Sequence, residues 1–127
     1  YESMEDTVDL EYEITEEGVV ITNINYAVAE VIIPGIIDGN MVSELKGMSP
    51  NATNVVIKNG LKKISNGAFR NCVYLESIYI PASVEIIENG AFENCLNLDE
   101  IIVSDNNPNF YSEDGKLYTI DGTAVFE

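Results

Sequence analysis

One seven-residue pattern occurs twice in the chain, and its spacing limits the possible folds more than any other feature of the sequence. Residues 66–72 read Asn-Gly-Ala-Phe-Arg-Asn-Cys, and residues 89–95 read Asn-Gly-Ala-Phe-Glu-Asn-Cys, 23 positions later. When residues 55–77 are aligned with residues 78–100, nine of the 23 positions are identical: Ile57/Ile80, Ile64/Ile87, Asn66/Asn89, Gly67/Gly90, Ala68/Ala91, Phe69/Phe92, Asn71/Asn94, Cys72/Cys95 and Leu75/Leu98. A fixed period of this length predicts a solenoid, in which each repeat forms one coil and stacks on the next.

Each repeat predicts short strands joined by a tight turn. Ile78 and Ile80 alternate as a half-buried strand requires, and the proline at position 81 cannot continue a hydrogen-bonded ladder. Residues 83–87 form a second short extended run, and Gly90 can adopt a positive φ at no steric cost. Residues 91–95 are too few for a stable isolated helix. We therefore expect a single helical or 3-10 turn there, with Phe92 and Cys95 directed into the core.

The repeat resembles the bacterial leucine-rich repeats of the BspA-like type, whose unit reads I-x-I-P-x-S-V-x-x-I-x-x-x-A-F-x-x-C-x-x-L. Residues 78–98 match nearly every position, whereas the preceding unit has Lys58 in place of the proline and Gly60 in place of the serine. The resemblance implies a leucine-rich repeat solenoid of the α/β repeat class, built mostly of short β-strands with single helical or 3-10 turns. It also implies a secreted or surface-anchored bacterial protein.

The flanking segments predict a single domain, 1–127, with a β-hairpin cap at each end. Residues 1–30 read as an acidic tail followed by an N-terminal hairpin, which we expect to cover the open core and the unpaired edge of the first coil. The repeats occupy residues 31–104, beginning with an irregular unit that we expect Leu45, Met48 and Ala52 to fill. Residues 105–127 contain Asp-Gly turns, resemble the N-x-x-F/Y-x-S-x-D-G-x-L-Y hairpin of the same family, and are the expected C-terminal cap.

The composition argues against several classes of partner. The chain has 22 acidic residues, six basic residues and a formal net charge of −16. Nucleic acids and anionic membranes both require a cationic surface, so we expect neither nucleic-acid binding nor membrane insertion. Residues 1–6 lack the cationic and apolar regions of a signal peptide, and if the chain is exported we expect its leader to have been removed already.

The sequence suggests no catalytic, cofactor-binding or metal-binding residues. Histidine is absent, and acids scattered over turns give no reason to expect a productive carboxylate pair. The segment that starts at Asp105 begins like an EF-hand loop, but Phe110 and Lys116 stand where glycine and glutamate are needed. A different oxygen-lined calcium site near Asp105, Asp114 or Asp121 remains an alternative to a simple turn role.

Cys72 and Cys95 take the same position in successive repeats. Equivalent side chains of stacked coils point in parallel and not at each other, so we expect two buried free thiols. A disulfide is the alternative, and zinc is disfavoured because two sulfurs leave a tetrahedral site half empty.

The alternation of the repeated strands predicts an exposed surface that could bind a partner. If Ile78 and Ile80 face the core, Tyr79 faces solvent together with its equivalents in the other coils. The candidate binding residues are Ile32, Val56, Tyr79 and Ile102, with Asn54, Ser77 and Glu100 two positions before three of them. Exposed β-branched and aromatic residues also stabilise strands by cross-strand pairing, so a purely structural role is the alternative.

Four of the six basic residues fall within one repeat, namely Lys58, Lys62, Lys63 and Arg70. We expect them to lie on a solvated face and to pair with acids such as Glu85 and Glu93. A local cationic binding spot is the alternative.

Together with the family resemblance, which implies adhesion to an extracellular protein, these observations favour a non-enzymatic protein-binding module with an unidentified extracellular protein as its ligand. The sequence does not give its oligomeric state, and we expect a monomer. A structural spacer without a ligand is the first alternative. A carbohydrate-contacting module is the second, although the chain has no tryptophan to form an aromatic platform.

Overall fold

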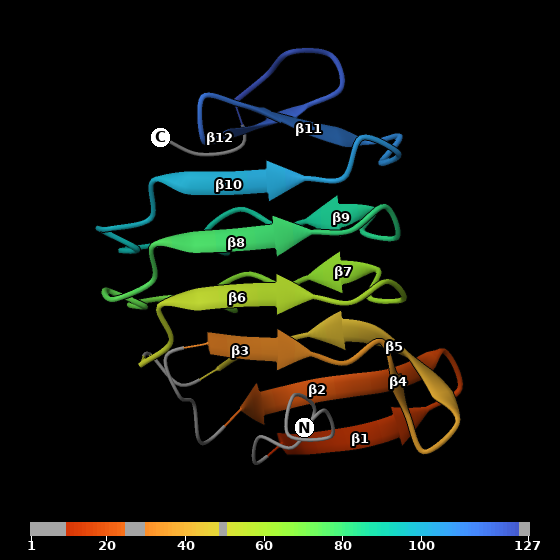
Figure 1. Ribbon diagram of the computed structural model, residues 1–127. Coiled ribbons are helices and arrows are strands. Elements are labelled where there is room, and N and C mark those ends of the chain that lie inside the picture. Colours follow the sequence, from red (N-terminus) through yellow and green to blue (C-terminus); the bar gives the residue numbers. More distant parts are fainter. Residues whose placement is uncertain (1–9, 25–29, 49–50, 125–127) are drawn as a thin grey trace.

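A computed structural model describes residues 10–24, 30–48 and 51–124. The chain winds into a solenoid in which equivalent strands of successive coils lie directly above one another (Figure 1). Among the described residues, the regular elements are strands, and no helix is formed.

The front of the solenoid is a parallel sheet with one strand from each coil. Its strands are β3 (Glu30–Ile33), β6 (Asn54–Ile57), β8 (Ser77–Ile80) and β10 (Glu100–Val103), in the order β10-β8-β6-β3. Val31 pairs with Val55 at an offset of 24 residues, which confirms the irregular first repeat. Along each strand buried residues alternate with more exposed ones, as the sequence predicts.

A second sheet lies behind the first. It contains β1 (Leu10–Thr15), β2 (Gly18–Ile24), β5 (Asn40–Leu45), β7 (Lys63–Ile64) and β9 (Ile86–Ile87), in the order β1-β2-β5-β7-β9, and β4 (Ile36–Ile37) pairs with β5. The two sheets enclose one core.

The repeated Asn-Gly-Ala-Phe segments close each coil through turns. In the first copy the N–H of Ala68 donates to the carbonyl of Ser65, and that of Cys72 donates to Phe69. These bonds join residues three apart, so the expected helical turn is present only as a series of hydrogen-bonded turns. Gly90 has the expected positive φ, 80°. The N–H of Phe69 also donates to the carbonyl of Ala91 at 2.8 Å, which joins successive coils.

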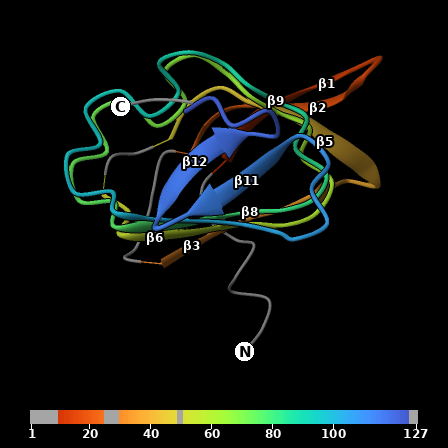
Figure 2. The same ribbon diagram turned by 90° about the horizontal axis from the view of Figure 1, so that it is seen from above.

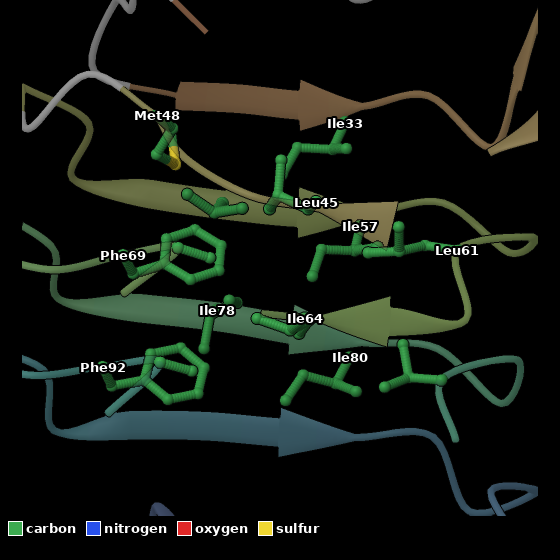
Figure 3. Packing of buried hydrophobic residues seen from close by; sticks show 14 of the residues in the cluster. Ile33, Leu45, Met48, Ile57, Leu61, Ile64, Phe69, Ile78, Ile80 and Phe92 are labelled. Atoms are coloured by element: carbon green, nitrogen blue, oxygen red, sulfur yellow. The ribbon is translucent and has the colours of Figure 1, made fainter. Parts of the chain in front are cut away.

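Columns of equivalent apolar side chains form the core (Figure 3). The rings of Phe69 and Phe92 stack with their centroids 5.2 Å apart and an angle of 6° between their planes. In the irregular first coil, the residues expected to fill the core are indeed buried: Leu45, Met48 and Ala52.

The N-terminal hairpin is formed by β1 and β2, as predicted, but only β2 covers the first coil. β2 pairs with β5 in parallel and buries Val19, Ile21 and Ile24. In β1, by contrast, Tyr12 and Ile14 are exposed. The expected closure of the edge is therefore incomplete, because β1 becomes the new edge of the sheet. The acidic tail expected before residue 10 lies outside the described residues.

The C-terminal hairpin lies across the other end of the stack (Figure 2). Its strands, β11 (Phe110–Glu113) and β12 (Lys116–Thr119), are antiparallel and are joined by an Asp-Gly turn, as expected. The N–H of Ile101 donates to the carbonyl of Gly115 at 3.0 Å and thereby attaches the hairpin to β10. The division of the chain into an N-terminal cap, repeats and a C-terminal cap, with boundaries at residues 30 and 104, stays a prediction.

Candidate protein-binding face

The outward side chains of the front sheet form an apolar ladder. Register pairing aligns Ile32 with Val56, Val56 with Tyr79, and Tyr79 with Ile102. Ile102 has 45% of its surface exposed, whereas the other three are half-buried by their neighbours in the ladder. The structure therefore brings together the four apolar residues that the sequence singles out.

A polar column runs beside the ladder, nearer the N-terminal ends of the strands. Asn54, Ser77 and Glu100 align in register, as predicted, and Glu30 extends the column by one residue. The hydroxyl of Ser77 donates to Oδ1 of Asn54 at 2.5 Å. We call the ladder and its polar column the strand face: Ile32, Val56, Tyr79, Ile102, Asn54, Ser77 and Glu100.

Four exposed carboxylates lie in the polar column or directly before it in the chain, and we call them the acidic margin: Glu30, Glu76, Asp99 and Glu100. Glu76 and Asp99 follow one another in the stack, because the N–H of Asp99 donates to the carbonyl of Glu76 at 3.2 Å. Within the described chain, none of the four carboxylates is in ion-pair distance of a cation. Sequence reasoning identified only Glu100 as part of a site.

Basic residues of the central repeat form ion pairs elsewhere, as the sequence predicts. Lys62 lies 3.7 Å from Glu85, and Arg70 lies 3.0 Å from Glu93. Lys63 sits 3.3 Å from the carboxylate of Glu88 and 3.9 Å from that of Glu44. These contacts join successive coils on the exposed back and turn side of the solenoid, where each pair contributes little stability.

The carboxyl groups with clearly shifted pKa values have structural partners. The pKa of Glu88 is lowered mainly because its carboxylate accepts the N–H of Asn66 at 2.9 Å, and also because Lys63 is close. The pKa of Asp121 is lowered by the hydroxyl of Thr119 and the N–H of Thr123. Both groups fix turns or join coils, which accounts for their shifts without a catalytic role.

Both cysteines are free thiols, as expected, but they differ in exposure. Cys72 is buried, and its hydrogen bond to Cys95 raises its pKa, with burial adding to the effect. Cys95 is only partly buried, and its thiol donates to the carbonyl of Phe69 at 3.0 Å. The expectation of two buried thiols therefore holds fully for Cys72 alone.

Asn107 is a buried polar residue whose role the sequence analysis missed. Its side-chain amide donates to the carbonyls of Pro81 and Val84, and its Oδ1 accepts the N–H groups of Asn109 and Phe110. It thus connects the last coil to the C-terminal hairpin. Its spacing of 23 residues from Val84 is the signal that could have revealed a core position.

The possible calcium ligands do not converge. In the residues that the structure places, no group of three or more His, Cys, Asp or Glu side chains could hold a metal ion. Asp114 instead occupies a turn with a φ of 55°.

The described residues also include no helix that is long and apolar enough to span a membrane.

Comparison with known proteins gives one family match. The family described as "BspA type Leucine rich repeat region (6 copies)" matches residues 46–114, which are 69 of the 127 residues. Because 69 divided by the period of 23 is three, the matched segment corresponds to three repeats of this chain. No curated protein sequence matches the chain significantly.

Solved leucine-rich repeat structures share the fold to different extents. A leucine-rich repeat protein of T. pallidum is 26% identical, with a TM-score of 0.67 over 73% of this chain and 46% of that one. One from Eubacterium ventriosum is 17% identical, with a TM-score of 0.35 over 91% of this chain and 47% of that one. The pneumococcal vaccine antigen PcpA is 13% identical, with a TM-score of 0.37 over 91% of this chain and 53% of that one. The chain therefore spans about half the length of these proteins.

Proposed function

The chain belongs to the BspA-type leucine-rich repeat family, and we propose that it is a non-enzymatic module that binds an extracellular protein through its strand face. The polypeptide that contains it would be a secreted or cell-surface bacterial protein. The family resemblance supports this location.

The in-register apolar ladder is the observation that carries the proposal. Four apolar side chains from four different coils form one continuous strip on a regular sheet. Because β6 and β8, beneath the middle of the strip, are hydrogen-bonded to strands on both sides, a partner that lies on the strip contacts side chains there and does not add a strand between them. An aromatic residue within such a strip is a typical anchor of a protein interface.

The ladder also contributes to the stability of the sheet through cross-strand contacts, and this is the basis of the spacer alternative. The two roles differ in what a polar substitution at Tyr79 does. A spacer loses only a little stability, whereas a binding module loses its ligand.

The test measures binding of the purified chain to a panel of extracellular matrix proteins and glycans at physiological salt. Tyr79→Ser removes the central anchor, and Tyr74→Ser is the matched control because Tyr74 is 58% exposed and lies outside the strand face. We expect saturable binding to a protein that weakens about tenfold or more in Tyr79→Ser and stays unchanged in Tyr74→Ser. Circular dichroism and urea unfolding verify that both variants are folded.

Three results would overturn the proposal. Binding that survives Tyr79→Ser would move the site away from the ladder, and saturable binding to glycans alone would favour the carbohydrate alternative. If the panel contains no ligand at all, the spacer alternative replaces the proposal for these classes of partner.

A further inference from the structure

We propose that the segment docking on the strand face is a cationic stretch of polypeptide in which lysine or arginine alternates with apolar side chains. Its cations lie over the acidic margin, at the N-terminal ends of β3, β8 and β10, and its apolar groups lie on the ladder. The inference rests on the proposed function, since it names the partner of the same face.

Exposed carboxylates gather on one side of the ladder, at the N-terminal ends of the strands. Glu76 and Asp99 occupy equivalent positions in successive coils, and Glu100 follows Asp99 directly. Glu30 adds a carboxylate at the far end of the column. Each of these side chains is exposed, and none is neutralised by a cation in the described chain. Like charges at this spacing repel one another, and a cationic partner relieves that repulsion.

The protein does not supply this neutralisation itself, although it does so elsewhere. Lys62, Lys63 and Arg70 all pair with carboxylates of neighbouring coils on the back and turn side. Acids therefore have cationic partners between coils on that side, whereas the acidic margin has none among the residues that the structure describes. This asymmetry gives the face a negative potential that steers positively charged segments toward it.

The ladder selects for apolar groups within the cationic segment. Lysine and arginine carry aliphatic stems that can lie on apolar surface while their charged heads remain in water. The half-exposed Ile102 and the ring of Tyr79 offer such a surface next to Glu100 and Asp99. A purely polar cation would reach the carboxylates but leave the ladder uncovered, so it should bind more weakly.

The test uses three labelled synthetic peptides of about ten residues, because four strands spaced ~4.8 Å apart require only about five extended residues to cross them. The first peptide alternates lysine with leucine, the second replaces lysine by glutamate, and the third replaces leucine by serine. Binding to the whole chain is measured by fluorescence anisotropy at increasing sodium chloride.

Two triple variants with the same change in net charge separate the acidic margin from general attraction to an acidic protein. Glu76→Gln, Asp99→Asn and Glu100→Gln neutralise the margin. Glu13→Gln, Glu16→Gln and Glu17→Gln neutralise exposed acids of the N-terminal hairpin, away from the front sheet.

We expect the lysine–leucine peptide to bind saturably and more tightly than the other two, with an affinity that falls as salt rises. The margin variant should weaken it about tenfold or more, and the hairpin variant by less than about threefold. Equal effects of the two triple variants, or equal binding of the lysine–serine peptide, would overturn the inference.

The proposed function is tested separately by Tyr79→Ser and its control. If Tyr79→Ser abolishes binding of a matrix protein while the margin variant does not, the strand face remains the site and the cationic partner is wrong. If Tyr79→Ser affects neither the matrix protein nor the peptide, both proposals fail.

Discussion

The two cysteines show how a repeated residue can acquire different chemistry in successive coils. Cys72 is enclosed between coils, whereas Cys95 belongs to the last regular coil and is partly exposed. Thiolate is the reactive form, and burial together with the hydrogen bond to Cys95 raises the pKa of the Cys72 thiol. We therefore expect iodoacetamide to modify Cys95 first in the folded protein.

Mass spectrometry of digested samples checks this order. Cys72 should react only at the rate of unfolding, and in a Cys95→Ser variant the folded protein should resist modification unless urea is added. Equal labelling of both cysteines without denaturant would contradict the described packing.

Glu88 makes a pH-dependent contribution to stability. Its pKa is lower in the folded protein than the ordinary value of 4.5, because it accepts the N–H of Asn66 and lies close to Lys63. The ionised group therefore stabilises the fold above pH 4.5, and this stabilisation disappears as the pH falls through the lowered pKa. We expect the difference in urea midpoint between the natural protein and Glu88→Gln to be largest near neutral pH and to shrink below pH 4.5.

Glu16→Gln is the control for this measurement, because general loss of negative charge also changes the stability of so acidic a chain. A midpoint difference for Glu88→Gln that is constant from pH 7 to pH 3 would show that the carboxylate is not stabilised by these partners.

At the scale of elements, the close approach of the C-terminal hairpin to the last coil requires a glycine at position 115. A Cβ atom on Gly115 would lie 2.2 Å from the carbonyl oxygen of Asp99, and its φ is +78°. Gly122 also has a positive φ, +96°, but its nearest neighbour would be 4.0 Å away. Gly122→Ala thus reports backbone strain alone and should cost about 1 kcal/mol.

Gly115→Ala should cost more than about 2 kcal/mol, since it adds a steric clash to the same strain. Urea unfolding gives both values, and faster hydrogen exchange of the Ile101 amide would show that the hairpin has moved away from β10. Equal costs for the two variants would mean that the hairpin does not pack closely on the last coil.

The sequence predicts the repeated elements well and the ends less well. Ile78, Phe92 and their equivalents recur with one period, so the position of each in a coil follows from the alignment. The pairing of β2 with β5 joins two segments that do not resemble each other, so no sequence repeat predicts this pairing. The exposure of β1 is not predicted, because alternating apolar residues there suggest a buried face, whereas among the described residues no layer covers that strand.

The candidate site was partly predictable for the same reason. The alignment of Tyr79 with Val56 and Ile102 follows from the period, and the structure has it in register. The acidic margin is not predicted as a unit, because Glu30 lies outside the repeats and Thr53 stands at the position equivalent to Glu76 in the preceding coil. Asn107 was read as a turn residue, since a run of Asn and Asp residues gives no indication of burial.

At the scale of the whole molecule, a single core runs through the stack while the two outer sides differ in chemistry. The back and turn side carry ion pairs between coils, and the front carries an apolar strip beside acids that have no ion-pair partner in the described part of the chain. A solenoid that serves only as a spacer needs no such difference. Binding of a partner protein at the front sheet explains this difference between the two sides.

Photo-crosslinking tests that account most directly. Benzoylphenylalanine would replace Tyr79 in one sample and the exposed Tyr74, outside the strand face, in another, and each would be irradiated with the same extracellular matrix proteins. We expect a defined cross-linked product from position 79 and none from position 74. Products of equal yield from both positions, or from position 74 alone, would contradict a binding site on the strand face.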